Sequence, residues 1–116
     1  MKWDGMITFL GTKDHEKSSE FYKGILGFPL FLDQGPCRIY DVPGGGQIGF
    51  CTHVPPTPGR NPVLTFLTDQ VDEMYNLFVE KGLKPHDKPK INEKYNIYHF
   101  FLNDPDGYLV EIQKFL

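Results

Sequence analysis

One carboxylate stands out as a candidate for chemistry. Glu111 lies on a predicted strand over residues 108–114, directly after a turn at 104–107 of sequence Asp-Pro-Asp-Gly. Proline presets φ at the second position of such a turn and glycine accepts a positive φ at the fourth, so the turn predicts a hairpin with the strand 97–103. The two neighbours of Glu111 are apolar and should face a helix, which turns Glu111 to the opposite face. A carboxylate among apolar groups needs a partner, and groups of this kind are enriched at functional sites as general bases or ligands.

His99 is the second candidate, because it lies on the strand paired with that of Glu111. Its orientation depends on the register of the hairpin. If Phe101 lies opposite Glu111, His99 shares the face of the carboxylate; if Phe100 does, His99 faces the helix. The sequence leaves both registers open, and it favours a half-buried histidine whose hydrogen bonds are made within the protein.

The chain reads as two similar halves, each with a strand, an acidic helix cap, an amphipathic helix and a glycine stop. The caps are Asp14 and Asp69, and the stops are Gly27 and Gly82. Two half-sheets of this kind tend to close around a shared concave face, called the cup here, and concave faces bind small molecules. Strands are predicted near residues 6–11, 29–33, 37–42, 47–52, 63–68, 83–87, 97–103 and 108–114.

A proline-rich segment separates the halves. Residues 53–62 contain four prolines, which lack N–H donors and restrict the residues before them. We therefore predict module one over 1–52, a linker over 53–62 and module two over 63–116, together forming a single domain over 1–116. The polar segment 87–96 is expected to be a mobile loop, and it could act as a lid.

Composition limits the function classes. With 116 residues, 40% apolar and 15% aromatic, the chain can bury one core. The net charge of −3 has no basic block, which argues against nucleic-acid and membrane partners. The N-terminus lacks the apolar stretch of a signal peptide, so we expect a cytoplasmic protein with Cys37 and Cys51 as reduced thiols. His15 and His53 are expected to be solvated.

Two motifs carry a family resemblance. Residues 18–28 (SSEFYKGILGF) resemble the FY…LGF signature of the vicinal oxygen chelate superfamily, and residues 104–112 (DPDGYLVEI) are similar to its DPDGxxxE hairpin. The superfamily includes glyoxalase I, bleomycin-resistance proteins, fosfomycin-resistance enzymes and extradiol dioxygenases. The resemblance implies an α+β fold of two tandem βαβββ modules that form a cupped mixed sheet with the helices on its convex face. It also suggests a homodimer.

Metal enzymes of this superfamily hold a divalent cation on the first and last strands of each module. The corresponding positions fall near Ile7, Gly49, Val63 and Glu111, of which only Glu111 can act as a ligand. A transition-metal site needs three or more suitable protein ligands. We therefore expect no metal and no other cofactor.

Three functions remain open. The favoured one is a metal-free protein, similar to bleomycin-type resistance proteins, that binds an aromatic or amphipathic small molecule in the cup. The second is a lyase or isomerase, similar to a glyoxalase or dioxygenase, in which Glu111 is the catalytic base or a metal ligand. The third is a protein-interaction module with a filled cup. Strand alternation predicts these ligand-binding residues: Phe9, Gln47, Cys51, Thr65, Phe100, Leu109 and Gln113.

Overall fold

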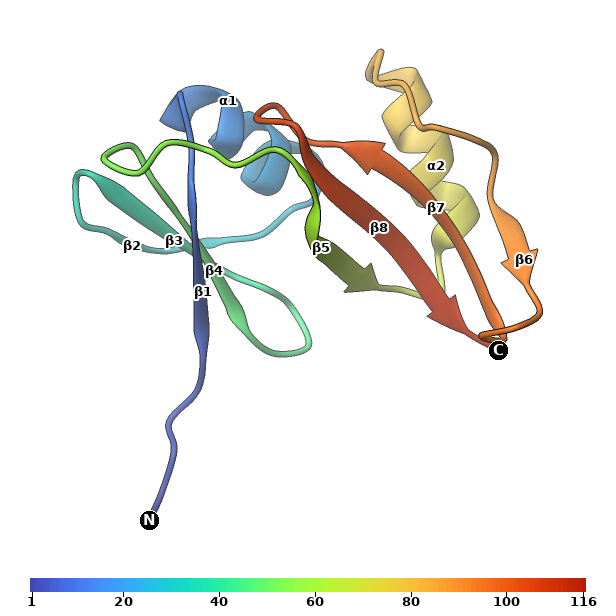
Figure 1. The fold of residues 1–116 in the computed structure, drawn as a ribbon, viewed down its shortest axis with the longest axis horizontal. Coiled ribbons are helices and arrows are strands. Elements are labelled where there is room, and N and C mark those ends of the chain that lie inside the picture. The colour runs from blue at the N-terminus through green and yellow to red at the C-terminus, as the bar shows by residue number, and fades with distance from the viewer. The chain divides into compact units, whose positions relative to one another are not determined.

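Each half of the chain folds as a βαβββ module (Figure 1). The computed structural model describes residues 1–116, which divide into two compact units, Met1–Thr57 and Pro58–Leu116. None of the helices is long and apolar enough to cross a membrane. The elements are β1 (Ile7–Gly11), α1 (His15–Ser19), η1 (Glu20–Ile25), β2 (Leu30–Asp33), β3 (Cys37–Asp41), β4 (Gln47–Cys51), β5 (Gly59–Leu67), α2 (Val71–Glu80), β6 (Lys90–Asn92), β7 (Ile97–Asn103) and β8 (Tyr108–Phe115).

The first unit contains a four-stranded mixed sheet in the order β1-β4-β3-β2. β1 runs parallel to β4, and the other pairs are antiparallel. Aromatic rings join the helical segment to one face of this sheet, with the centroids of Tyr22 and Phe50 4.5 Å apart. Both side chains are fully buried, so this contact forms the centre of the unit's core.

The helical segment of the first unit begins and ends as predicted, although its winding changes midway. Asp14 is the N-cap, and its Oδ1 accepts a hydrogen bond of 2.8 Å from the backbone N–H of Glu16. After α1 the chain continues as the π-helix η1. Gly27 ends the segment with φ of 78°, a conformation that glycine adopts without a steric penalty.

The second unit repeats the arrangement with the order β5-β8-β7-β6. α2 packs on one face of this sheet, where the ring of Phe100 meets those of Tyr75 and Phe78 at centroid distances of 5.4 and 5.9 Å. The predicted cap Asp69 is wrong. Gln70 occupies the N-cap position of α2, and its side chain makes no capping hydrogen bond. The backbone N–H of Gln70 donates to the hydroxyl of Thr68.

Two strand predictions for this unit also differ from the structure. No strand forms at 83–87, where Pro85 cannot donate to a neighbouring strand, and the fourth strand is β6, which pairs antiparallel with β7. The predicted loop 87–96 is therefore anchored at its centre. The last residues of the predicted linker belong to β5, which is an edge strand of the sheet. Pro62 lies within a register irregularity of β5 between Gly59 and Val63, where a proline is tolerated.

Candidate functional site

The hairpin of β7 and β8 positions the candidate carboxylate. The turn forms as predicted: Oδ1 of Asp104 accepts hydrogen bonds from the backbone N–H groups of Asp106 (2.8 Å) and Tyr108 (2.9 Å). Gly107 has φ of 90°, which its missing side chain permits. The turn is thus fixed from inside by one buried aspartate, and the strand that carries Glu111 leaves it in a defined direction.

Register brings three side chains together on the face opposite α2. Thr65 on β5 and Phe101 on β7 are the partners of Glu111 on β8. Of the two registers that the sequence leaves open, this one places His99 on the same face as Glu111, since alternate residues of a strand share a face. His99 itself lies opposite Gln113.

Glu111 is buried and uses both of its oxygens. Oε1 accepts a hydrogen bond of 2.7 Å from the hydroxyl of Thr65, and Oε2 lies 2.6 Å from Nδ1 of His99. Glu111 and His99 are each 7% exposed. An ionised carboxylate only accepts hydrogen bonds, so the hydrogen of the imidazole is assigned to Nδ1, which leaves Nε2 as the ring nitrogen available to another molecule. The expected need for a partner is met within the module.

A hollow of about 530 Å³ lies over this pair and is called the Glu111 pocket. Its polar groups sit among aromatic rings, and the ring of His99 packs edge-on against Phe101 at a centroid distance of 5.2 Å. The mixture suits a planar ligand that stacks and makes one or two hydrogen bonds. The pocket is lined by Asn92, Tyr95, Ile97, His99, Phe101, Glu111, Gln113 and Phe115.

The four ligand-binding residues predicted for module two do not all lie at the Glu111 pocket. Thr65 bonds Glu111, and Gln113 lines the Glu111 pocket. Leu109 shares their face but lines a separate hollow of about 160 Å³. Phe100 is a wrong prediction for this face, because its ring packs against α2.

The three predicted residues of module one lie in the first unit. The ring of Phe9 lies over Gly49 on the face opposite the helical segment, where a Cβ on Gly49 would come within 2.6 Å of it. The side chain of Gln47 donates a hydrogen bond of 2.8 Å to Asp41. Cys51 is bonded to Cys37 in a disulfide, which corrects the expectation of reduced thiols.

Pairing between β3 and β4 explains the disulfide. Cys37 and Cys51 are direct register partners, so their side chains leave neighbouring strands on the same face.

His15 differs from its expected solvation: it is half-buried, and its Nε2 donates to the carbonyl oxygens of Pro36 (2.9 Å) and Gly35 (3.2 Å). His53 is exposed, as expected.

Sequence reasoning missed five residues that line the Glu111 pocket, of which Ile97 and Phe101 lie on the predicted strand 97–103. Asn92 and Tyr95 belong to the segment interpreted as a loop, and Phe115 follows the predicted end of the last strand. Aromatic residues within a polar segment were the available signal, since exposed aromatic rings are typical of binding surfaces.

A family model describes nearly the whole chain. The model of the glyoxalase/bleomycin resistance protein/dioxygenase superfamily matches residues 6–112. The chain belongs to this superfamily. The chain is also similar to the uncharacterised protein YraH of Bacillus subtilis strain 168. The two are 27% identical over an alignment of 129 residues, which covers 89% of this chain and 91% of the relative.

Solved structures support the same fold for this superfamily member. A family enzyme from Burkholderia phytofirmans PsJN superposes with a TM-score of 0.81 at 24% identity, covering 95% of this chain and 97% of that one. A lactoylglutathione lyase from Agrobacterium tumefaciens gives a TM-score of 0.76 at 19% identity, covering 94% and 91%. At these identities the likeness shows the fold alone.

The metal site of the superfamily does not fit the residues of this member. Of its four ligand positions, those near Ile7, Gly49 and Val63 carry no donor atom in their side chains. The fourth, Glu111, already accepts hydrogen bonds from Thr65 and His99. These four positions thus supply at most one ligand, below the three protein ligands that a catalytic zinc site uses. The chemistry of the Glu111 pocket is therefore derived from its own side chains.

Proposed function

We propose that this protein binds an aromatic small molecule carrying a hydrogen-bond donor, and preferably a positive charge, in the Glu111 pocket. The observation that carries the proposal is the buried pair of Glu111 and His99 beneath an aromatic lining. The rings of Tyr95, Phe101 and Phe115 offer stacking surface. The pair offers one acceptor, Nε2 of His99, backed by a negative charge.

The role of Glu111 in this proposal is indirect. Both of its oxygens are occupied, so it acts by fixing the imidazole and by supplying charge. A ligand N–H donates to Nε2 of His99, and the nearby carboxylate stabilises the cation that carries it. The same charge disfavours an anionic ligand of similar shape, which gives the pocket a means of discrimination.

The test uses three planar probes of similar size, benzamidine (cationic), benzamide (neutral) and benzoate (anionic). Each is titrated into ¹⁵N-labelled protein, and amide shifts are followed by NMR. We expect benzamidine to shift residues of the Glu111 pocket, with His99 and Gln113 among them, and to slow amide exchange at the 93–96 turn. Benzoate is expected to bind at least tenfold more weakly, since a charge contact contributes about 1.4 kcal/mol or more.

Two variants check the assignment. Glu111→Gln removes the pocket's charge and should weaken benzamidine binding about tenfold or more, whereas Glu93→Gln removes a charge from an exposed residue of the neighbouring turn and should not. Benzamidine shifts that map outside the pocket, or equal affinity for benzamidine and benzoate, would contradict the proposal.

The same pair supports a second candidate function, metal-independent proton transfer. A carboxylate that holds an imidazole by Nδ1–H leaves Nε2 to take a proton from a substrate carbon and return it to another position, as an isomerase requires. The test is deuterium uptake from D₂O by aryl ketones with acidic C–H bonds. Uptake that exceeds buffer and is lost in His99→Gln favours this function; uptake equal to buffer excludes it for these substrates.

A further inference from the structure

A second group of chemically active side chains lies in the first unit, at the ends of β3 and β4. Cys37 and Cys51 face each other across these strands, and His53 follows two residues later, with its Nδ1 4.0 Å from Sγ of Cys37. The three donor atoms all lie within 4.8 Å of one another. We propose that these residues bind one Zn²⁺ ion when the disulfide between Cys37 and Cys51 is reduced.

The spacing suits tetrahedral coordination. Zinc–sulfur bonds of about 2.3 Å and zinc–nitrogen bonds of about 2.0 Å place neighbouring donors roughly 3.5–3.8 Å apart. The separation of Cys37 and His53 is already close to this value, and reduction frees the two sulfurs to move apart to it. Two thiolates and an imidazole are a typical zinc ligand set, with water completing the fourth position.

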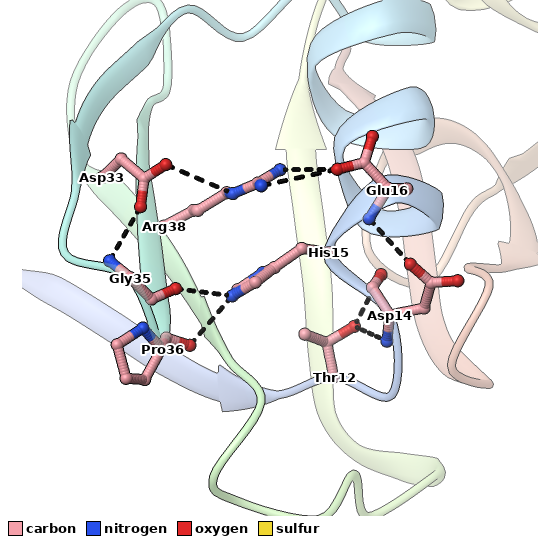
Figure 2. A network of polar contacts seen from close by, with 8 residues as sticks. All are labelled: Thr12, Asp14, His15, Glu16, Asp33, Gly35, Pro36 and Arg38. Carbon is pink, nitrogen blue, oxygen red and sulfur yellow. Dashed lines mark hydrogen bonds and ion pairs between the residues drawn. The ribbon is translucent and has the colours of Figure 1, made fainter.

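Polar contacts hold the start of β3, and so Cys37, in place (Figure 2). The carbonyl oxygen of Pro36, the preceding residue, accepts hydrogen bonds from Nε2 of His15 and from the backbone N–H of Thr52. The guanidinium of Arg38, the following residue, lies 3.4 Å from Glu16 and 3.6 Å from Asp33.

These anchors have a consequence for binding. The backbone before Cys37 is held by α1 and by the residue that follows β4, and the backbone after Cys37 pairs with β4, so the site loses little conformational entropy when a cation binds. Burial differs among the ligands: Cys51 is 3% exposed, Cys37 is half-buried and His53 is exposed. A cation can therefore enter from the side of His53 while Cys51 closes the inner side.

The disulfide and the bound cation exclude each other, because a disulfide has no thiolate to offer. Hydrogen peroxide converts one state to the other. One thiolate sulfur attacks a peroxide oxygen, the O–O bond breaks, and the departing hydroxide is protonated to water. The second thiolate attacks this sulfur, forms the S–S bond and expels hydroxide, which becomes the second water. Two electrons pass to one peroxide, two protons are consumed, and Zn²⁺ loses two of its three protein ligands.

This site is separate from the ligand positions of the superfamily and from the Glu111 pocket, whose residues belong to the second unit. It also departs from the sequence-based expectation of a metal-free protein, which rested on the superfamily's ligand positions and gave Cys37 and Cys51 only as reduced thiols. Their pairing across β3 and β4 brings them together.

The experiment compares reduced and oxidised full-length protein. The chain is reduced anaerobically with a phosphine, the phosphine is removed, and Co²⁺ is titrated as a spectroscopic substitute for Zn²⁺. We expect one Co²⁺ per chain, thiolate-to-cobalt charge-transfer absorption, tetrahedral d–d bands and displacement by Zn²⁺. The oxidised protein should show none of these signals. One equivalent of hydrogen peroxide should release bound Zn²⁺ to a colorimetric chelator while the protein loses the mass of two hydrogens.

Variants decide whether the three residues act together. His53→Ala removes an exposed ligand that the fold does not need, and should weaken Co²⁺ binding about tenfold or more. His86→Ala, at an exposed histidine of the second unit, is the matched control and should leave binding unchanged. Unchanged affinity in His53→Ala, a cobalt spectrum without thiolate absorption, or one Co²⁺ shared between two chains would overturn the proposal.

Discussion

Replacing Glu111 by glutamine should change the tautomer of His99. In the native pair the carboxylate accepts at both oxygens, from the hydroxyl of Thr65 and from Nδ1–H of His99. Glutamine offers one carbonyl oxygen and one NH₂ group in the same shape. If the oxygen keeps the bond with Thr65, the NH₂ faces Nδ1, and two donors would meet unless the hydrogen moves to Nε2. We therefore expect His99 to change from the Nδ1–H to the Nε2–H form.

The energetic effect of Glu111→Gln follows from the same contacts. A hydrogen bond to a charged group contributes about 1.5–3 kcal/mol and a neutral one about 0.5–1.5 kcal/mol, so remaking the His99 contact as a neutral bond costs about 1 kcal/mol of unfolding free energy. Both residues are 7% exposed, so water does not replace the lost bond. If Glu111 were buried without a partner, its replacement by glutamine would raise the stability of the protein. Glu111 is paired with His99, so this increase is not expected.

Two measurements check this prediction. Long-range ¹H–¹⁵N correlation spectra report which ring nitrogen of His99 carries hydrogen, and denaturant titration reports the free energy of unfolding. Glu93→Gln, at an exposed position, controls for the loss of a charge. A native His99 with its hydrogen on Nε2, or a variant that keeps Nδ1–H, would refute the reasoning.

Three further predictions concern the fold around the candidate sites. Thr65→Val should lower the free energy of unfolding by about 1.5–3 kcal/mol, because it removes a hydrogen bond to the charged carboxylate of Glu111. Thr65→Ser keeps the hydroxyl and should lower it less in the same denaturant titration. Gly11→Ala should destabilise by about 1–3 kcal/mol, because its Cβ would come within 2.6 Å of the backbone oxygen of Pro55, whereas Gly24→Ala, whose Cβ meets nothing closer than 3.9 Å, should be neutral or stabilising on thermal unfolding. The hydrogen bond from Tyr98 to Asp72 raises the pKa of the Tyr98 phenol above its usual value of 10.0. The stabilising effect of this bond is therefore present below pH 10 and is lost as the pH rises through the raised pKa. Asp72→Asn should lower the pKa of Tyr98 in a ¹³C NMR titration, and an unchanged value would contradict the assignment.

The sequence predicted the hairpin but not its register, and the difference lies in one residue of the turn. A turn of four residues, 104–107, would pair Asn103 with Tyr108 and place Phe100 opposite Glu111. Tyr108 instead bonds back to Asp104 by both its N–H and its carbonyl, so the first pair is Asn103 with Leu109. This shift by one residue turns Phe100 towards α2 and His99 towards Glu111.

Long-range pairing explains what else the sequence could not supply. Motifs in adjacent residues identified the superfamily and the helix stops, since caps and turns are fixed by local geometry. The disulfide joins residues 14 positions apart that meet only because β3 pairs with β4 in one particular register. The strand β6 likewise depends on its partner β7, because three polar and apolar residues carry no strand pattern of their own.

Both candidate chemistries arise from cross-strand neighbours, yet they belong to different compact units and can be tested independently. His99 and Glu111 meet across β7 and β8, and Cys37 and Cys51 meet across β3 and β4. Strand neighbours are held by the backbone hydrogen bonds of the sheet, which makes their separation insensitive to surface motion. Because Glu111→Gln changes one unit and His53→Ala the other, loss of probe binding in the first variant with intact cobalt binding would assign each activity to its own module.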